Sequence, residues 1–211
     1  MLKKLITFSA ILCTGQAWAA CADGAAGPNG VDSATEGSTC DNSGTSYIGN
    51  NTAYASGSGS VLNFLPGTVI SSKGVAAVYT LAVGGVNSGG SIPGAGATVH
   101  AKGDLTVNGN ALGSTRSIFI FSGTDAGGKR NSLQIDGNLT ATRTGGLYGA
   151  VIENTGGDLL VAGKTSLTSN VSDALRIRGD ANCTFRGSPS INVCGSNGIF
   201  QSGGTVNFYR D

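Results

Sequence analysis

Leu105-Thr106-Val107-Asn108-Gly109 is the stretch that decides the predicted fold, because variants of this phrase recur along the second half of the chain. In each copy an apolar residue and a β-branched apolar residue stand two positions apart, and a glycine ends the phrase. Residues two apart point to the same face of a strand, and glycine allows the turn that follows. The other copies occupy residues 133–137, 159–163, 175–179 and 191–195.

The spacing of the copies predicts how the strands are wound. The copies begin at Leu105, Leu133, Leu159, Leu175 and Ile191, so two long spacings precede two shorter, equal ones. Three short strands with their corners take roughly 20–28 residues, so each long spacing fits one coil and each short spacing fits two-thirds of a coil. We therefore predict an all-β chain that forms a right-handed parallel β-helix. A β-sandwich or jelly roll is the alternative, because it also uses short strands with frequent turns.

Composition agrees with an all-β chain and argues against some partners. Glycine accounts for 36 of the 211 residues, or roughly one in six, against a usual share of about 7%. Charged residues make up 12% of the chain, against a usual share of about 25%. Outside residues 1–19 there is no long helical period of apolar residues. No basic cluster is present, so we expect neither nucleic acid nor an anionic membrane as a partner.

The first residues have the three parts of a secretory signal peptide, which we place at residues 1–19. Lys3 and Lys4 supply the positive charge, residues 5–13 are apolar, and Ala17-Trp18-Ala19 is a small-x-small cleavage site. Lipidation of Cys21 is the alternative, although Trp18 stands where such signals carry leucine. We read residues 20–60, which are rich in glycine and polar residues, as an irregular N-terminal cap. The β-helix domain is then predicted at residues 61–211.

Four cysteines remain after the leader, an even number that favours disulfides in an oxidising compartment. They are Cys21, Cys40, Cys183 and Cys194. Three connectivities are open, and proximity in the sequence favours Cys21–Cys40 and Cys183–Cys194. The chain has no Cys-x-x-Cys motif, and its single histidine lies far from all four. We therefore predict no metal site.

A set of aspartates is the other candidate for chemistry: Asp104, Asp136, Asp158 and Asp180. The last three are evenly spaced, and a coil of that same length would stack their carboxylates into a column that could bind Ca²⁺ or act as acid and base. Each one adjoins a glycine, however, which is typical of turn residues. We expect turn residues, and we predict no catalytic, cofactor-binding or metal residue.

Two further groups of polar residues are assigned to solvated surface. We expect His100, the single histidine, at a coil tip or a sheet edge. Arg176 and Arg178 alternate with apolar residues, so they should face outward, beside Arg186 if the coils align. A solvated face is the expectation here, with an anion or glycan site as the alternative.

Three segments resemble the passenger domains of bacterial autotransporters of the pertactin and diffuse-adherence-adhesin type. They are Gly103-Asp104-Leu105-Thr106-Val107, Asp136-Gly137-Asn138-Leu139-Thr140 and Gly157-Asp158-Leu159-Leu160-Val161. Over residues 61–211 the resemblance implies a right-handed β-helix that is exported to the outer membrane and used for adhesion, aggregation or biofilm formation. It also implies few, closely spaced cysteines, which suits Cys183 and Cys194. A complete member ends in a translocator barrel, which this chain does not show, so we expect a truncated or split passenger or a stand-alone secreted β-helix.

The functional prediction is an exported, surface-associated, non-enzymatic and monomeric protein. It would act as an adhesin toward a host surface or neighbouring cells, with protein or glycan as its partner. We expect it at the cell surface, associated with the outer membrane through a translocator, or outside the cell, and in the periplasm if no translocator exists. Two alternatives stay open: a polysaccharide-active β-helix enzyme, and a fimbrial-type subunit with a sandwich fold.

Overall fold

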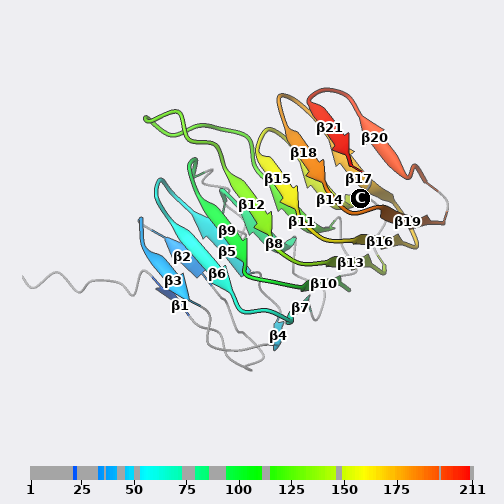
Figure 1. Cartoon of the computed structure of the whole chain (residues 1–211), viewed down its shortest axis with the longest axis horizontal. Coiled ribbons are helices and arrows are strands. Elements are labelled where there is room, and N and C mark those ends of the chain that lie inside the picture. The colour runs from blue at the N-terminus through cyan, green and yellow to red at the C-terminus, as the bar shows by residue number, and fades with distance from the viewer. Residues whose placement is uncertain are drawn as a thin grey trace, which may run out of the picture.

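The computed structural model describes residues 21–22, 33–35, 37–41, 46–49, 53–72, 79–85, 94–110, 115–145, 149–194 and 196–209. The predicted signal peptide lies outside these residues. Strands are the regular elements of the described part, which contains no helix long and apolar enough to cross a membrane. The strands stack into three sheets whose order follows the chain (Figure 1).

Sheets A, B and C form the three walls of the molecule. Sheet A contains β1 (Cys21–Ala22), β2 (Ser33–Thr35), β5 (Ala53–Ser56), β8 (Tyr79–Val83), β11 (Thr115–Ile120), β14 (Gly149–Asn154), β17 (Asp173–Ile177) and β20 (Ile199–Gln201). Sheet B contains β3 (Thr39–Asp41), β6 (Val61–Phe64), β9 (Thr98–Ala101), β12 (Ser132–Ile135), β15 (Asp158–Val161), β18 (Asn182–Phe185) and β21 (Thr205–Phe208). Sheet C contains β4 (Ser46–Gly49), β7 (Thr68–Ser72), β10 (Leu105–Gly109), β13 (Leu139–Arg143), β16 (Thr165–Ser169) and β19 (Pro189–Val193).

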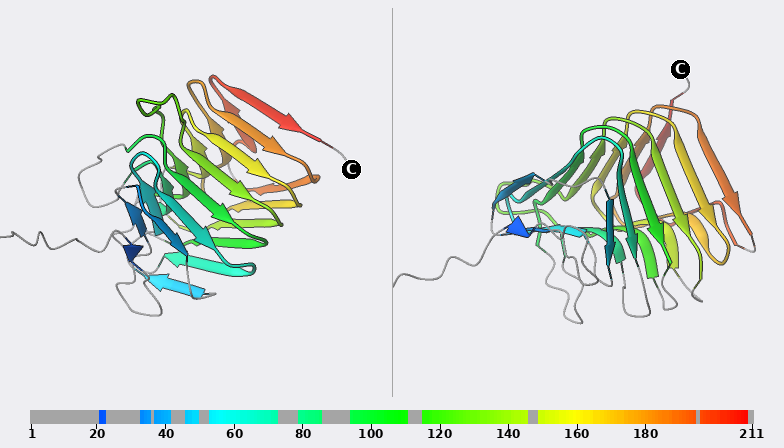
Figure 2. Two further views of the ribbon diagram at one scale, coloured as in Figure 1. Left: turned by 60° about the vertical axis from the view of Figure 1, so that its left-hand side comes forward. Right: turned by 90° about the horizontal axis from the view of Figure 1, so that it is seen from below.

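The order of the strands confirms the predicted solenoid. From β2 onward the chain visits sheets A, B and C in turn, and each strand pairs in parallel with the strand three places further along, as β12 does with β9 and β15. Successive coils are therefore stacked side by side, which Figure 2 shows as a series of similar arches. Sandwiches are built from antiparallel sheets, so this alternative is excluded. Crossovers between parallel strands are right-handed in about 98% of cases, which is the hand that we expect here.

The register of the strands shows that coil length varies. Asn108 pairs with Thr142 at a sequence separation of 34, whereas Asp158 pairs with Asn182 at a separation of 24. Leu133 pairs with Leu159, so the spacing between these two copies of the phrase is one coil, as predicted. The two shorter spacings lead from sheet B to sheet A and from sheet A to sheet C, so each is two-thirds of a coil, also as predicted. The first spacing was assigned wrongly, because Leu105 lies in sheet C and Leu133 in sheet B. The long loop at residues 121–131 lengthens this coil.

The solenoid begins earlier than residue 61. Strands β2, β3, β4 and β5 already pair in parallel with β5, β6, β7 and β8, so the predicted irregular cap contains coils of the helix. Sequence did not indicate these coils because their inward residues include Ala34 and Ala55, which are buried but small. The antiparallel pairing of β1 with β2 covers the first edge of sheet A, an edge that would otherwise offer unpaired backbone groups.

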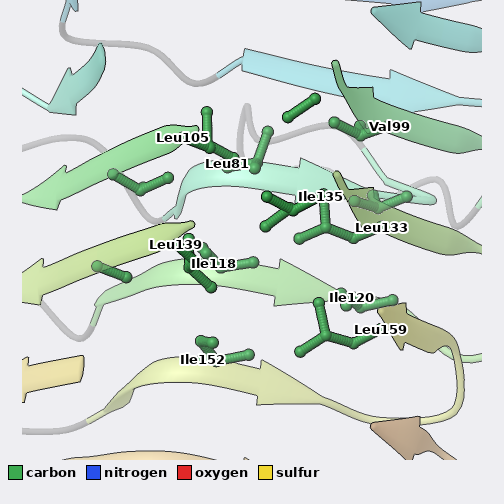
Figure 3. Packing of buried hydrophobic residues seen from close by; sticks show 14 of the residues in the cluster. Leu81, Val99, Leu105, Ile118, Ile120, Leu133, Ile135, Leu139, Ile152 and Leu159 are labelled. Carbon is green, nitrogen blue, oxygen red and sulfur yellow. The ribbon is translucent and has the colours of Figure 1, made fainter. Parts of the chain in front are cut away.

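Inward side chains from all three sheets meet in one core. In sheet B the column of Leu62, Val99, Leu133, Leu159 and Cys183 is almost fully buried. Figure 3 shows Leu133 and Leu159 together with side chains of the other two walls. Each buried leucine contributes about 1.5–3 kcal/mol relative to an exposed one. The core therefore fixes which residues of each strand point outward.

Buried asparagines hold the corner that leads from sheet A into sheet B. The Oδ1 atom of Asn131 accepts a hydrogen bond from Ala97 N at 3.0 Å, and its Nδ2 atom donates to Phe121 O at 3.1 Å. Asn154 repeats this role one coil later, because its Oδ1 atom accepts from Gly157 N at 2.8 Å. Gly84 lies against Asn131, with a positive φ of 87° and no room for a Cβ atom. These contacts hold the residues that directly precede β9 and β15.

Candidate functional site

The outer face of sheet B is hollowed into a groove of ≈ 820 Å³ that crosses four successive coils. Strands β12, β15 and β18 supply most of its lining, and the segments that follow β18 and β21 supply the rest. The lining residues are Ser132, Leu133, Gln134, Asp158, Leu159, Leu160, Asn182, Thr184, Arg186 and Tyr209. Strands lie about 4.8 Å apart, so the groove is roughly 14 Å long from β12 to β21.

Alternation along the strands determines which side chains line the groove. Leu133 and Leu159 point into the core, so their neighbours face outward. The parallel register then aligns these neighbours across the coils. One row contains Ser132, Asp158 and Asn182, and a second row contains Gln134, Leu160 and Thr184. The groove therefore presents equivalent positions at regular intervals of one strand spacing.

The lining combines neutral hydrogen-bonding groups with one carboxylate, one guanidinium group and one aromatic ring. The Nδ2 atom of Asn182 donates to Asp158 Oδ1 at 3.1 Å, and Arg130 NH1 lies 3.4 Å from the same oxygen. Arg186 and Tyr209 lie at the C-terminal end of the groove, and Tyr209 is 55% exposed. A flat ring beside amides and hydroxyls can hold a ligand that has both apolar faces and polar edges.

Arg130 ties the margin of the groove together. It lies at the end of the loop that projects between β11 and β12 in Figure 1. Its Nε and NH2 atoms donate to Gly156 O at 3.0 and 2.6 Å, and NH2 also donates to Asp180 O. One side chain from this coil thus binds the backbone of the next two coils. These hydrogen bonds hold the turns that precede β15 and β18, two of the strands that line the groove.

A polar cluster borders the groove on the side of β9. The Nε2 atom of His100 lies 2.7 Å from Asp136 Oδ2, and Gln134 Nε2 donates to Asp136 Oδ1 at 2.8 Å. The hydrogen bonds from Gln134 and then from His100 hold the pKa of Asp136 below its ordinary value. The prediction of His100 at a tip or edge was wrong, because it lies inside sheet B between Asn63 and Gln134.

The aspartates that sequence singled out do not form a column. Asp158 pairs with Ser132 and Asn182 rather than with another aspartate. The coils here are longer than the spacing between successive aspartates, so the aspartates fall at different positions in their coils. Asp104 Oδ1 instead accepts from Asn138 N of the next coil at 2.7 Å, so it joins two coils rather than bonding its own turn. Within the described ranges, no group of three His, Cys, Asp or Glu residues could hold a metal ion.

The predicted Cys183–Cys194 disulfide is wrong, because both residues are free thiols. Cys183 points into the core from β18, and Cys194 is exposed just after β19. Burial raises the pKa of Cys183 to about 11, although Asn154 Nδ2 donates to its Sγ atom at 3.4 Å. The Cys21–Cys40 bond stays a prediction, since the side chain of Cys21 lies outside the described part.

The three arginines that were expected together lie on two walls. Arg176 and Arg178 project from β17 and its end on the outer face of sheet A, where they contact Glu153. Arg186 follows β18 and lines the groove on sheet B. Their grouping required one shared face, but residues 175–179 belong to sheet A and residue 186 follows a strand of sheet B.

Sequence did not point to Gln134, Thr184 and Tyr209 as site residues. Alternation along each strand could place their side chains outward, but it could not show which outward residues of different coils lie side by side. That depends on the length of each coil, which differs from one coil to the next.

Comparisons with protein-family models, with curated proteins and with solved structures find no match. The resemblance to autotransporter passengers therefore rests on the residues that carry it. The solenoid that it implies is confirmed by the strand pairings.

Proposed function

We propose that this chain is an exported, non-enzymatic β-helix that adheres to neutral polysaccharide through the groove on sheet B. The observation that carries the proposal is the lining of the groove, in which neutral amides and hydroxyls lie in register across the coils and end at the exposed ring of Tyr209. A surface-anchored passenger fragment or a stand-alone secreted protein could both present such a groove.

The chemistry of sugars matches this lining. Each sugar ring carries hydroxyl groups that both donate and accept hydrogen bonds, and amide and hydroxyl side chains such as Gln134, Asn182 and Thr184 do the same. The apolar face of a sugar ring can pack on Tyr209 and on the half-buried side chain of Leu160. A rigid groove also loses little conformational freedom when an extended chain binds. These features support recognition of several consecutive sugar units.

The lining of the groove supports binding of a polysaccharide better than its cleavage. Glycoside hydrolysis uses two carboxyl groups roughly 5–9.5 Å apart. Among the described lining residues only Asp158 carries a carboxylate, and it is engaged by Asn182 and Arg130. The polysaccharide-active enzyme is therefore the less supported alternative. The fimbrial-subunit alternative required a sandwich, which the parallel sheets exclude.

A retention assay tests the proposal. Mannan, galactan and dextran are immobilised, and the chain without its predicted leader is applied as wild type and as Tyr209→Ala. We expect wild-type retention on at least one polymer and about tenfold weaker binding by the variant, which corresponds to about 1.4 kcal/mol. Thr142→Ala, on the outer face of sheet C, is the control and should bind like wild type.

Two results would contradict the proposal. Lack of wild-type retention on all three polymers would remove neutral polysaccharide as the ligand class. Release of reducing ends from a retained polymer would show that the protein cleaves its ligand and would favour the enzyme alternative.

A further inference from the structure

Sheet A carries a cluster of charged side chains that is separate from the groove. Its members are Arg116, Arg176, Arg178, Glu153 and Asp173, which we call the arginine cluster. They come from β11, β14 and β17 and from the arginine that directly follows β17. Sheet A and sheet B are different walls of the solenoid, so one ligand group cannot contact both sites at once.

Glu153 is the centre of the arginine cluster. Its Oε2 atom lies 2.7 Å from Arg116 Nε and 3.6 Å from Arg176 NH1, and its Oε1 atom lies 3.6 Å from Arg178 Nε. The Glu153 side chain is only 2% exposed. Glu153 therefore acts as an internal counter-ion that gathers three guanidinium groups over a small area.

Asp173 provides the second negative charge. Its Oδ2 atom accepts from Arg176 Nε at 2.9 Å and from NH2 at 2.6 Å, while its Oδ1 atom accepts from Ser196 Oγ at 2.7 Å. Burial alone would raise the pKa of Asp173, but the hydrogen bonds from Ser196 and Arg176 and the charge of Arg176 outweigh it and lower the pKa. Asp173 thus stays ionised at neutral pH and neutralises Arg176.

Three arginines accompany two carboxylates, so the arginine cluster has an excess of positive charge. The whole chain has a formal net charge of only +1, so this excess is local.

Among the described residues, the two most accessible arginines of the cluster have terminal nitrogens without a hydrogen-bond partner. Arg116 and Arg178 both direct their Nε atoms toward Glu153, and no hydrogen bond joins their terminal nitrogens to another described residue. The Arg178 side chain is 48% exposed and that of Arg116 is 24% exposed. A planar guanidinium with free terminal N–H groups binds carboxylate or sulfate through two parallel hydrogen bonds.

Aromatic rings adjoin these donors. The Arg116 guanidinium lies 5.4 Å from the ring centroid of Phe119 and 6.0 Å from that of Tyr79. Phe121 packs against both rings, with centroid distances of 4.4 Å to Phe119 and 5.6 Å to Tyr79. Tyr79 and Phe121 are partly exposed, so the surface offers apolar ring faces next to these cationic donors.

We propose that the arginine cluster and these three aromatic rings form a second binding site, which takes the carboxylated or sulfated sugar units of an acidic polysaccharide. The guanidinium forks bind the acid groups, and the partly exposed rings of Tyr79 and Phe121, which Phe119 supports from beneath, pack against the sugar faces. A nucleic acid fits less well, because its backbone requires a line of basic groups, whereas Glu153 and Asp173 stand among these arginines. This site does not rest on the function proposed for the groove.

The test measures affinity for heparin and for polygalacturonate, which supply sulfate and carboxylate respectively. The salt concentration is about 0.15 M, where charges more than about 8 Å apart are largely screened. We expect wild-type protein to bind one or both polymers. Arg178→Gln should weaken binding about tenfold, and Arg178→Lys, which keeps the charge but loses the fork, about threefold. The preferred polymer identifies the acid group.

Matched controls make the result specific to sheet A. Lys164→Gln removes the same charge from an exposed turn before β16 and should change affinity less than twofold. Tyr209→Ala, in the groove, should also leave acidic-polysaccharide binding unchanged. Equal thermal stability of the Arg178 variants and wild type, measured by circular dichroism, excludes a folding defect.

Three outcomes would overturn the inference: no wild-type binding to either polymer, equal losses for Arg178→Gln and Lys164→Gln, or tighter binding to oligo(dT) than to both polysaccharides. If mannan, galactan and dextran binding fails while heparin or polygalacturonate binding persists, the groove proposal fails alone.

Discussion

Leu159 and Leu160 are adjacent in the chain, and the structure assigns them opposite roles. Leu159 is 2% exposed and lies in the core column between Leu133 and Cys183. Leu160 faces outward, is half-buried and lines the groove. Because a strand repeats every two residues, a register shifted by one would exchange the two leucines. Replacing each by alanine therefore tests which face of β15 points into the solenoid.

The expected effects differ by several kcal/mol. Leu159→Ala removes a fully packed side chain, and the cavity closes poorly because Leu133 and Cys183 are held by parallel ladders on both sides. Buried Leu→Ala changes cost about 2–5 kcal/mol, and we expect about 3–5 kcal/mol here because the site is rigid. Leu160→Ala leaves no internal cavity and should cost less than about 1 kcal/mol.

Urea unfolding followed by far-ultraviolet circular dichroism measures the difference. The free energies are compared only if the m-values agree, since a change in m would indicate partial unfolding of the coils. Equal losses for the two variants, or a larger loss for Leu160→Ala, would refute the assigned register and with it the positions of the groove residues.

Four further predictions concern the two thiols, the stability at high pH, the stability at low pH and a corner amide. In native protein a thiol reagent at pH 8 should modify Cys194 and spare Cys183, and modification of both at similar rates would contradict the burial of Cys183. Burial raises the pKa of Cys183 to about 11 in the folded protein, against an ordinary value of 9.0. The neutral thiol should therefore contribute its full stability below pH 9, and this contribution should fall between pH 9 and 11. Cys183→Val should abolish this fall, measured as the melting temperature at alkaline pH. The lowered pKa values of Asp136 and Asp173 predict stability that is complete above their ordinary pKa of 3.8 and falls below it, measured as a melting temperature that drops from pH 5 to pH 2. Asn154→Leu should cost more than about 2 kcal/mol in urea unfolding, since the backbone N–H of Gly157 loses its acceptor; a loss under about 1 kcal/mol would show that the corner does not depend on it.

The fold could be predicted because the core positions repeat. Copies of the phrase such as residues 133–137 and 159–163 carry leucine and a β-branched residue at the inward positions of sheet B. The first coils escaped prediction because inward Ala34 and Ala55 give almost no apolar contrast. Their strands are held by backbone hydrogen bonds to the strands of the next coil. Such backbone hydrogen bonds cannot be recognised from the residue types of a single strand.

The groove could not be predicted, since it depends on how different coils align. Asp158 was noted for its spacing to other aspartates, but its neighbours are Ser132 and Asn182. The cysteine error has a similar cause. Cys183 and Cys194 are close in the sequence, yet one side chain points into the core and the other out of the molecule. Proximity in the sequence says nothing about the side of the wall on which a side chain lies.

The central functional claim is that neutral sugar chains bind on the outer face of sheet B. The most direct measurement is a map of backbone amide chemical shifts during titration with trisaccharides of mannose, galactose and glucose. We predict that at least one of them shifts the amides of Gln134, Leu160 and Thr184 and leaves that of Thr142, on sheet C, unchanged. Shifts confined to sheets A or C, or no shift with any of the three sugars, would contradict the claim.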